Sequence, residues 1–231
     1  MKDEYGDAEA GADAIGLAAI RASYDTVAAD YAELAATAFD ALSEDHKVLA
    51  DFADRVRGDG LGPIADLGCG PGHVTAFLAG RGGPVFGVDL SPGMIAVAES
   101  KYPDLRFHVG SMTRLALADA SLGGVLTWYS THHMPAGLVA EAFTEVCRVL
   151  APGGRLLWGS HAGTGERVAK TEAYGHPVSY ESHLLPVDQV AGLIEAAGLR
   201  ITARQEEQVP GSQRWHARLW AVKAGVVGAA D

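Results

Sequence analysis

Hydrophobic and polar positions repeat with a helical period in the first quarter of the chain. Between residues 11 and 57, apolar and aromatic side chains recur every three or four positions, and Tyr24, Val27 and Tyr31 lie on the resulting stripe. This spacing is typical of helices that bury one face. The pattern therefore predicts helices over residues 11–57, with a second helical stretch from about residue 44 to residue 57.

Short apolar runs alternate with amphipathic stretches after Pro63. Strands are predicted at residues 64–67, 85–88, 105–109, 122–128, 155–159, 199–205 and 215–222. Helices are predicted at residues 71–79, from Ser91 onward, at 138–150 and at 187–197. Ser91 precedes Pro92, which gives a capping hydroxyl followed by a proline at the first helical position. Residues 162–185 are polar, and we expect them to form an irregular insert.

The order of these segments predicts the fold class. Strands that alternate with helices of about 10–15 residues form crossover units in a mostly parallel sheet. The last two predicted strands have no helix between them, so at least one of them is expected to be antiparallel. We predict one α/β domain over residues 1–231, with a Rossmann-like, doubly wound, seven-stranded sheet whose last strand is antiparallel. Residues 1–57 add a helical amino-terminal segment.

Composition and charge exclude several classes of partner. The chain has 231 residues, 48% of them hydrophobic, with 18 Lys and Arg against 29 Asp and Glu. A net charge of −11 repels nucleic acid, and no apolar run approaches the roughly 18 residues of a membrane span. The two cysteines, Cys69 and Cys147, are too few for a disulfide framework and lie in no zinc-type spacing, which favours a reducing cytoplasm. We expect a cytoplasmic monomer or homodimer that binds neither nucleic acid nor membrane.

A glycine-rich loop follows the first predicted strand, and it marks a nucleoside site. Ligands of doubly wound sheets bind beyond the carboxyl ends of the strands, and Asp66-Leu67-Gly68-Cys69-Gly70-Pro71-Gly72 stands there. The dinucleotide fingerprint places a third glycine where this chain has His73. Asp66 would repel a pyrophosphate but suits a cationic group. Asp89 follows Asp66 by 23 residues, about where an acidic side chain receives ribose hydroxyls.

These features describe a nucleoside with ribose hydroxyls, a positive charge and no pyrophosphate. S-adenosylmethionine has all three, although such a loop alone also serves NAD or FAD. The chain further resembles the class I S-adenosylmethionine-dependent methyltransferases, in the branch that acts on small molecules. The resemblance rests on residues 66–72, 87–94, 110–112, 124–130 and 148–154, in that order. Together these segments extend the resemblance over about residues 20–222.

The resemblance implies roles for individual residues. Asp66, Gly68 and Gly70 would hold the methionine part of the cofactor, and Asp89 its ribose. The adenine would lie against Leu90, Met94, Ser111 and Met112. Ser111 departs from the acidic residue that many relatives have at this position, which puts that contact in doubt. Trp128, Tyr129 and His133 would border the reactive methyl group.

The amino-terminal helices would form a lid over the cofactor and the acceptor. The lid, residues 1–57, would bring Tyr24 to the acceptor and Tyr31 to the methionine tail. The substrate-side insert, residues 162–185, would contribute Tyr180, Glu181 and His183 to the acceptor pocket.

A histidine is the expected base, because imidazole takes up and releases protons near neutral pH. His161 follows a strand, at the rigid edge that faces the ligand, and a Tyr24–His161 proton relay is our hypothesis for proton removal. We expect no metal ion, because the histidine spacings fit no zinc pattern and Trp128-Tyr129-Ser130 replaces the acidic ligands of metal-dependent catechol methyltransferases. The aromatic residues favour a planar, aromatic or indole-like acceptor from specialised metabolism.

Three other functions remain open at this point. A nicotinamide oxidoreductase would use the glycine loop for a dinucleotide, and His73 in place of the third glycine is the feature against it. A lyase or cyclase on the same fold would use S-adenosylmethionine as a bound charge and would not consume it. A non-catalytic protein would bind the cofactor without forming a methylated product.

Overall fold

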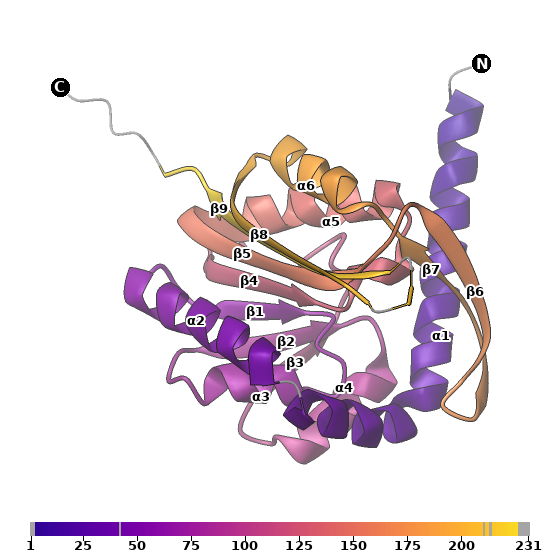
Figure 1. Cartoon of the computed structure of the whole chain (residues 1–231), viewed down its shortest axis with the longest axis horizontal. Coiled ribbons are helices and arrows are strands. Elements are labelled where there is room, and N and C mark those ends of the chain that lie inside the picture. The colour runs from indigo at the N-terminus through magenta and orange to yellow at the C-terminus, as the bar shows by residue number, and fades with distance from the viewer. Residues whose placement is uncertain (1–2, 42, 210, 213, 226–231) are drawn as a thin grey trace.

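A seven-stranded sheet in the order β3-β2-β1-β4-β5-β9-β8 forms the centre of the computed structural model, which describes residues 3–41, 43–209, 211–212 and 214–225 (Figure 1). Its strands are β1 (Ile64–Leu67), β2 (Val85–Asp89), β3 (Arg106–Val109), β4 (Leu122–Trp128), β5 (Leu150–Ala162), β8 (Leu199–Gln208) and β9 (Trp215–Lys223). Only β9 in this sheet runs antiparallel to its neighbours β5 and β8. The predicted fold class is thus confirmed.

Helices cover both faces of the sheet. They are α1 (Asp3–Ala41), α2 (Ser43–Asp59), α3 (His73–Ala79), α4 (Pro92–Lys101), α5 (Ala136–Val149) and α6 (Val187–Ala196), with a short 3-10 helix η1 (Thr131–His133). One hydrophobic cluster joins α5 and α6 to the sheet, and a second joins α2 and α3 to its other face. Every residue of β1 and β4 is buried, as expected for central strands covered on both sides.

The strand order reverses between β1 and β4, and this point positions the site. Both neighbours of β1 are parallel to it, with β2 on one side and β4 on the other. The connections after β1 and β4 therefore leave the sheet in opposite directions and open a crevice at its carboxyl edge. In Figure 1 this edge points toward α1.

The insert is a β-hairpin, which corrects the expectation of an irregular segment. Strands β6 (Glu166–Ala173) and β7 (His176–Leu184) pair antiparallel as a separate two-stranded sheet. Tyr174 and Gly175 form the turn, with φ angles of 54° and 79°. A two-residue turn with both residues at positive φ has a backbone twist that matches the twist of the two hairpin strands. Most hairpin side chains are at least partly exposed, so the segment lacks the apolar alternation by which a strand is recognised.

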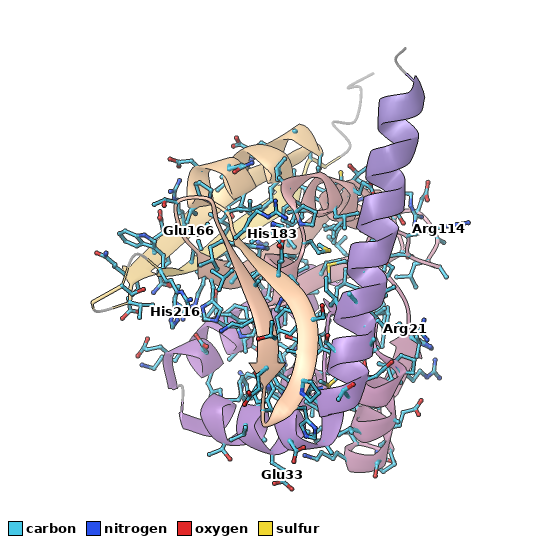
Figure 2. All side chains as sticks on the ribbon, turned by 90° about the vertical axis from the view of Figure 1, so that its right-hand side faces the viewer. Arg21, Glu33, Arg114, Glu166, His183 and His216 are labelled. Atoms are coloured by element: carbon cyan, nitrogen blue, oxygen red, sulfur yellow. The ribbon has the colours of Figure 1, made fainter. Side chains whose placement is uncertain are left out.

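The long helix α1 lies against α4 and the hairpin, and Figure 2 shows the hairpin beside α1. Val27 and Ala28 of α1 pack with Met94 of α4 and Val178 of β7. Asp25 Oδ1 accepts hydrogen bonds from Ser91 Oγ at 2.6 Å and from the Gly93 backbone N–H at 2.8 Å. The same Ser91 Oγ caps α4 by accepting from the Met94 N–H, as its sequence predicted.

Candidate active site

A cavity of about 470 Å³ lies at the carboxyl edge of the sheet, beneath α1. This volume falls within the range of small-molecule sites. Its walls contain the following predicted site residues: Tyr24, Tyr31, Asp66, Gly68, Gly70, Asp89, Leu90, Met94, Ser111, Met112, Trp128, Tyr129, His133 and His161. Residues separated widely along the chain thus meet around one space.

The glycine loop forms the floor of this cavity. Gly68 and Gly70 have φ angles of 75° and 52°, which disfavour other residues. A Cβ atom at Gly68 would lie 2.2 Å from the Cβ of Ser130, so a side chain there would displace the loop after β4. A Cβ atom at Gly70 would meet only the Tyr31 ring, at 3.7 Å. The backbone of the loop is therefore open toward α1.

Asp66 lies at the start of this loop and is almost completely buried, with 1% of its surface exposed. Its Oδ2 accepts a hydrogen bond of 2.6 Å from Thr75 Oγ1. Burial raises the pKa of the carboxyl group to about 7, although the bond from Thr75 opposes the shift. A cation placed beside this group would stabilise its ionised form. Asp66 therefore fits a cationic ligand better than an anionic one.

Asp89 ends β2 and links the glycine loop to α4. One carboxylate oxygen accepts from the Gly70 N–H and the other from the Ser91 N–H, both at 2.8 Å. Burial raises the pKa of Asp89, and the two backbone donors oppose this shift. A carboxylate oxygen can accept more than one hydrogen bond, so Asp89 can also receive ribose hydroxyls.

The side chains predicted to hold the adenine lie together beside Asp89. Leu90 directly follows β2 and Met94 belongs to α4, while Ser111 and Met112 belong to the segment after β3. Met94 is buried in the cluster beneath α1, so it also packs the core. The Ser111 hydroxyl lies 2.8 Å from Thr113 Oγ1.

Two aromatic residues at the carboxyl end of β4, its last residue Trp128 and the following Tyr129, form another wall. The Trp128 ring fills the space above Gly159, where an added Cβ would lie 2.4 Å from the ring. Tyr129 adopts a φ of 51°, a conformation that costs a non-glycine residue about 1–3 kcal/mol. Its ring centroid lies 4.8 Å from that of His161. Burial raises the pKa of Tyr129 to about 12, which keeps its hydroxyl protonated near neutral pH.

Tyr24 is hydrogen-bonded to His133, at 2.7 Å between Oη and Nε2. The predicted relay joined Tyr24 to His161, and the observed partner differs because η1 carries His133 beneath α1. Burial raises the pKa of Tyr24 well above its usual value and lowers that of His133 to about 4. The pair is therefore an intact phenol and a neutral imidazole at neutral pH.

His161 belongs to a row of imidazole rings on the same side of the cavity. Ring centroids are 3.9 Å apart for His133 and His132, 5.4 Å for His132 and His161, and 5.2 Å for His161 and His216. Burial lowers the pKa of His161 to about 4 and that of His132 well below its usual value. These two imidazoles are neutral at pH 7.

Three predicted acceptor residues do not line the cavity. Tyr180 stacks on the outer side of Tyr24, with ring centroids 5.8 Å apart. Glu181 forms an ion pair with Arg167 across the hairpin, at 2.6 Å. His183 lies 3.7 Å from the same carboxylate. Arg167 lies opposite His183 in the hairpin and reaches Glu181 diagonally across the two strands, a contact that the expectation of an irregular insert did not anticipate.

Sequence reasoning did not identify several lining residues, among them Asp45, Tyr174 and His216. Asp45 is hydrogen-bonded to Arg218, which lies 173 positions away, and both side chains are buried. Tyr174 reaches the cavity from the hairpin turn and meets Tyr31 edge to face, with centroids 5.2 Å apart. The local indication of this turn in the sequence is Gly175, because glycine is common in two-residue hairpin turns and Tyr174 directly precedes it.

Metal sites and membrane spans are absent from the part of the chain that the structure describes. No group of three or more His, Cys, Asp or Glu side chains is placed there to hold a metal ion. No described helix combines the length and apolar character needed to cross a bilayer.

Residues 64–154 match the family model described as a methyltransferase domain. A demethylmenaquinone methyltransferase of Chlorobaculum parvum is 36% identical over 101 residues, which are 43% of this chain and 41% of that protein. The matched region thus spans about two fifths of the length of the curated relatives.

Solved structures share the fold over more of the chain. A S-adenosylmethionine-dependent methyltransferase from Methanosarcina mazei has a TM-score of 0.64 at 18% identity, and the match covers 71% of this chain and 92% of that one. The [4+2]-cyclase SpnF has a TM-score of 0.58 at 17% identity, with coverage of 76% and 82%. The family-model match, the curated relatives and the shared fold support the resemblance to class I S-adenosylmethionine-dependent methyltransferases that the motifs predicted.

Proposed function

We propose that this chain transfers the methyl group of S-adenosylmethionine to a small-molecule acceptor in the cavity beneath α1. The observation that supports the proposal is a single cavity with two chemically different walls. Asp66 and Asp89 offer carboxylates on one wall, beside the sterically open backbone of the glycine loop. Tyr24, His133 and His161 offer proton-accepting groups on the other.

The cofactor wall fits the charges of S-adenosylmethionine. Asp66 suits the cationic methionine amino group, and the N–H groups at the start of α3 suit a carboxylate. Asp89 would accept hydrogen bonds from the ribose hydroxyls. Leu90, Met94, Ser111 and Met112 form the adenine side, and Tyr31 lies over Gly70. The bound cofactor would supply an electrophilic methyl group on a sulfonium.

The acceptor wall would orient the nucleophile and remove its proton. Alignment within reacting distance lowers the barrier of a displacement by several kcal/mol. Tyr24 Oη can take a proton from an acceptor hydroxyl or amine as its own proton passes to His133 Nε2, which lies 2.7 Å away. His161 is the alternative base, since it lines the same wall. Trp128 and Tyr129 would hold a planar, aromatic or indole-like acceptor of specialised metabolism.

The proposal also includes a lid over the cavity and a cellular setting for the chain. We assign the lid to residues 1–57, of which residues 1–2 and 42 lie outside the described part, and a substrate-side role to the hairpin through Tyr174. Tyr180 would support Tyr24 from outside. We propose that the chain works in the cytoplasm, where Cys69 and Cys147 remain thiols, without nucleic acid.

Incubation with labelled S-adenosylmethionine and a panel of phenols, aromatic amines and indoles tests the proposal. We expect one of these acceptors to gain label while S-adenosylhomocysteine accumulates in equal amount. A cyclase, which the shared fold of SpnF keeps as the second candidate, would rearrange its substrate without S-adenosylhomocysteine. Cofactor binding without turnover of any acceptor would instead indicate a binding protein.

A further inference from the structure

The cavity walls carry carboxylates but no permanently cationic side chain. Asp45, Asp66 and Asp89 contribute to the lining, and the lining residues that the structure describes include neither lysine nor arginine. His133 and His161 in these walls are neutral at pH 7, because burial lowers the pKa of each to about 4. A negatively charged ligand therefore meets repulsion that no lining lysine or arginine offsets.

Asp45 has a different setting from the two other aspartates. Asp66 and Asp89 flank the glycine loop, where the cationic cofactor would balance their charge. Asp45 lies at the amino end of α2 and is hydrogen-bonded to Arg218 of β9. It is also close enough to Tyr129 on the acceptor wall to raise the pKa of that hydroxyl.

Arg218 is the charged group behind the acceptor wall. Its side chain is 6% exposed, and its Cζ lies 5.8 Å from the ring centroid of Trp128. Its Nη2 donates to Asp45, whereas its buried Nε has no hydrogen-bond partner within the described residues. Arg218 would attract an anion bound against Trp128 if Asp45 did not neutralise it.

We propose that the Asp45–Arg218 pair keeps the acceptor wall electrically neutral, so that the site selects neutral or cationic aromatic acceptors and rejects carboxylates and phosphates. This inference rests on the proposed methyl transfer. Burial of an anion without a counter-charge is unfavourable. A neutral phenol or indole brings no charge to bury, and an ammonium group meets Asp66 and Asp89 in the same cavity with no lining lysine or arginine to repel it.

Two matched sets of probes test the charge preference of the wild-type chain. Calorimetry with bound S-adenosylhomocysteine compares tryptophol, tryptamine and indole-3-acetate, and then tyrosol, tyramine and 4-hydroxyphenylacetate. We expect the neutral or the cationic member of at least one set to bind at least tenfold more tightly than its carboxylate. Equal or tighter binding of the carboxylates contradicts the inference, and so does a failure of all six probes to bind.

Two variants test the pair itself. Asp45→Asn leaves the charge of Arg218 uncompensated, and we expect the ratio of carboxylate to neutral-probe affinity to rise at least tenfold. The double variant Asp45→Asn/Arg218→Gln removes both charges and should restore the wild-type ratio, since the wall is again neutral. An unchanged ratio in a folded Asp45→Asn chain contradicts the role of the pair. If Asp45→Asn does not fold, the double variant Asp45→Leu/Arg218→Met takes its place. We expect this double variant to keep the wild-type preference for uncharged probes. If it instead gains affinity for the carboxylates, the proposal is overturned.

The same measurements separate this inference from the proposed function. If the chain does not bind S-adenosylhomocysteine but still prefers the uncharged probes, the methyltransferase proposal fails and the charge preference stands. If the chain methylates carboxylate acceptors as readily as neutral ones, the methyltransferase proposal stands and the charge preference fails.

Discussion

Asp66 is a buried carboxyl group whose charge depends on what binds beside it. Its pKa of about 7 means that near neutral pH the empty site is a mixture of neutral and ionised forms. A bound cation stabilises the ionised form and lowers that pKa. Cofactor binding should therefore release a proton from Asp66 below pH 7, and the affinity should depend on pH.

We predict that S-adenosylmethionine binds more tightly as the pH rises from 5.5 to about 7, by up to about tenfold per unit, and that its affinity then levels off. The sign follows because protonated Asp66 must ionise before it can pair with the cation. Asp66→Asn should bind more weakly and lose the pH dependence. Calorimetry measures both, with Asp104→Asn, an exposed change, as the control. Wild-type affinity that is constant over this range contradicts the assignment.

The hydrogen-bonded pair of Tyr24 and His133 is the second place where single side chains determine the proposed chemistry. Tyr24→Phe removes the hydroxyl but keeps the ring, and it should lower kcat by about 10²- to 10⁴-fold on a hydroxyl or amine acceptor. Cofactor affinity should remain within about twofold. His133→Asn should resemble Tyr24→Phe, since each change breaks the hydrogen bond of 2.7 Å. Normal kcat in both variants, with an inactive His161→Asn, would assign the base to His161 instead.

The pH profile of kcat offers an independent check on the base. A histidine base works in its neutral form, so its activity falls as the pH drops through its pKa. The pKa of His133 is lowered to about 4, as is that of His161. At saturating cofactor, we therefore predict a constant kcat from pH 8 to about pH 5.5. A decline centred near pH 6.5 would indicate a base with the ordinary histidine pKa.

At the scale of elements, α1 is attached to the sheet domain through a few defined contacts. Asp25 joins it to the amino end of α4, and Val27 packs against that helix and the hairpin. His176 of β7 lies 2.6 Å from Asp30 of α1. Since α1 roofs the cavity, the strength of these contacts should govern how readily a ligand leaves.

Asp25→Ala should loosen α1 without altering the cavity walls. Two hydrogen bonds to a partly exposed carboxylate are lost, a change of about 1–2 kcal/mol in the docking of the helix. We expect S-adenosylhomocysteine to dissociate about tenfold faster and the amides of α1 to exchange faster with solvent. Stopped-flow fluorescence and hydrogen exchange measure these effects. Glu33→Ala, on the exposed side of α1, serves as the control, and equal rates in both variants would argue against a lid.

The helices and strands also show which parts of the fold and of the candidate site can be predicted from sequence patterns. The limits of most strands, the places of Asp66 and Asp89 at strand ends and the Ser91 cap could be predicted, because each depends on residues within about one turn or strand. The limits of β5 could not, since it extends over Leu150–Ala162 and only residues 155–159 were predicted. The partners of Tyr24 and Asp45 could not, because His133 and Arg218 lie 109 and 173 positions away. The hairpin was missed because its exposed strands need no apolar alternation. Its turn pairs Tyr174 with Gly175, which differs from the common Asn-Gly signal.

For the whole molecule, the cavity couples distant parts of the chain. Its walls come from α1, the ends of β2, β4 and β5, the start of α2 and the hairpin turn. A ligand that fills it contacts segments from both ends of the chain. Ligand binding should therefore stabilise the folded molecule as a unit, and stability can report on the site without any knowledge of the acceptor.

We predict that S-adenosylhomocysteine at a hundred times its Kd raises the free energy of unfolding by about 2.7 kcal/mol. For a chain of 231 residues this corresponds to an increase in Tm of roughly 5–10 °C. Gly68→Ala should reduce the increase, because its Cβ would lie 2.2 Å from that of Ser130 and displace the loop on which the ligand rests. Gly83→Ala is the matched control, since nothing lies within 4 Å of a Cβ there. Scanning calorimetry measures the shift, and an equal increase in both variants would place the ligand away from the glycine loop.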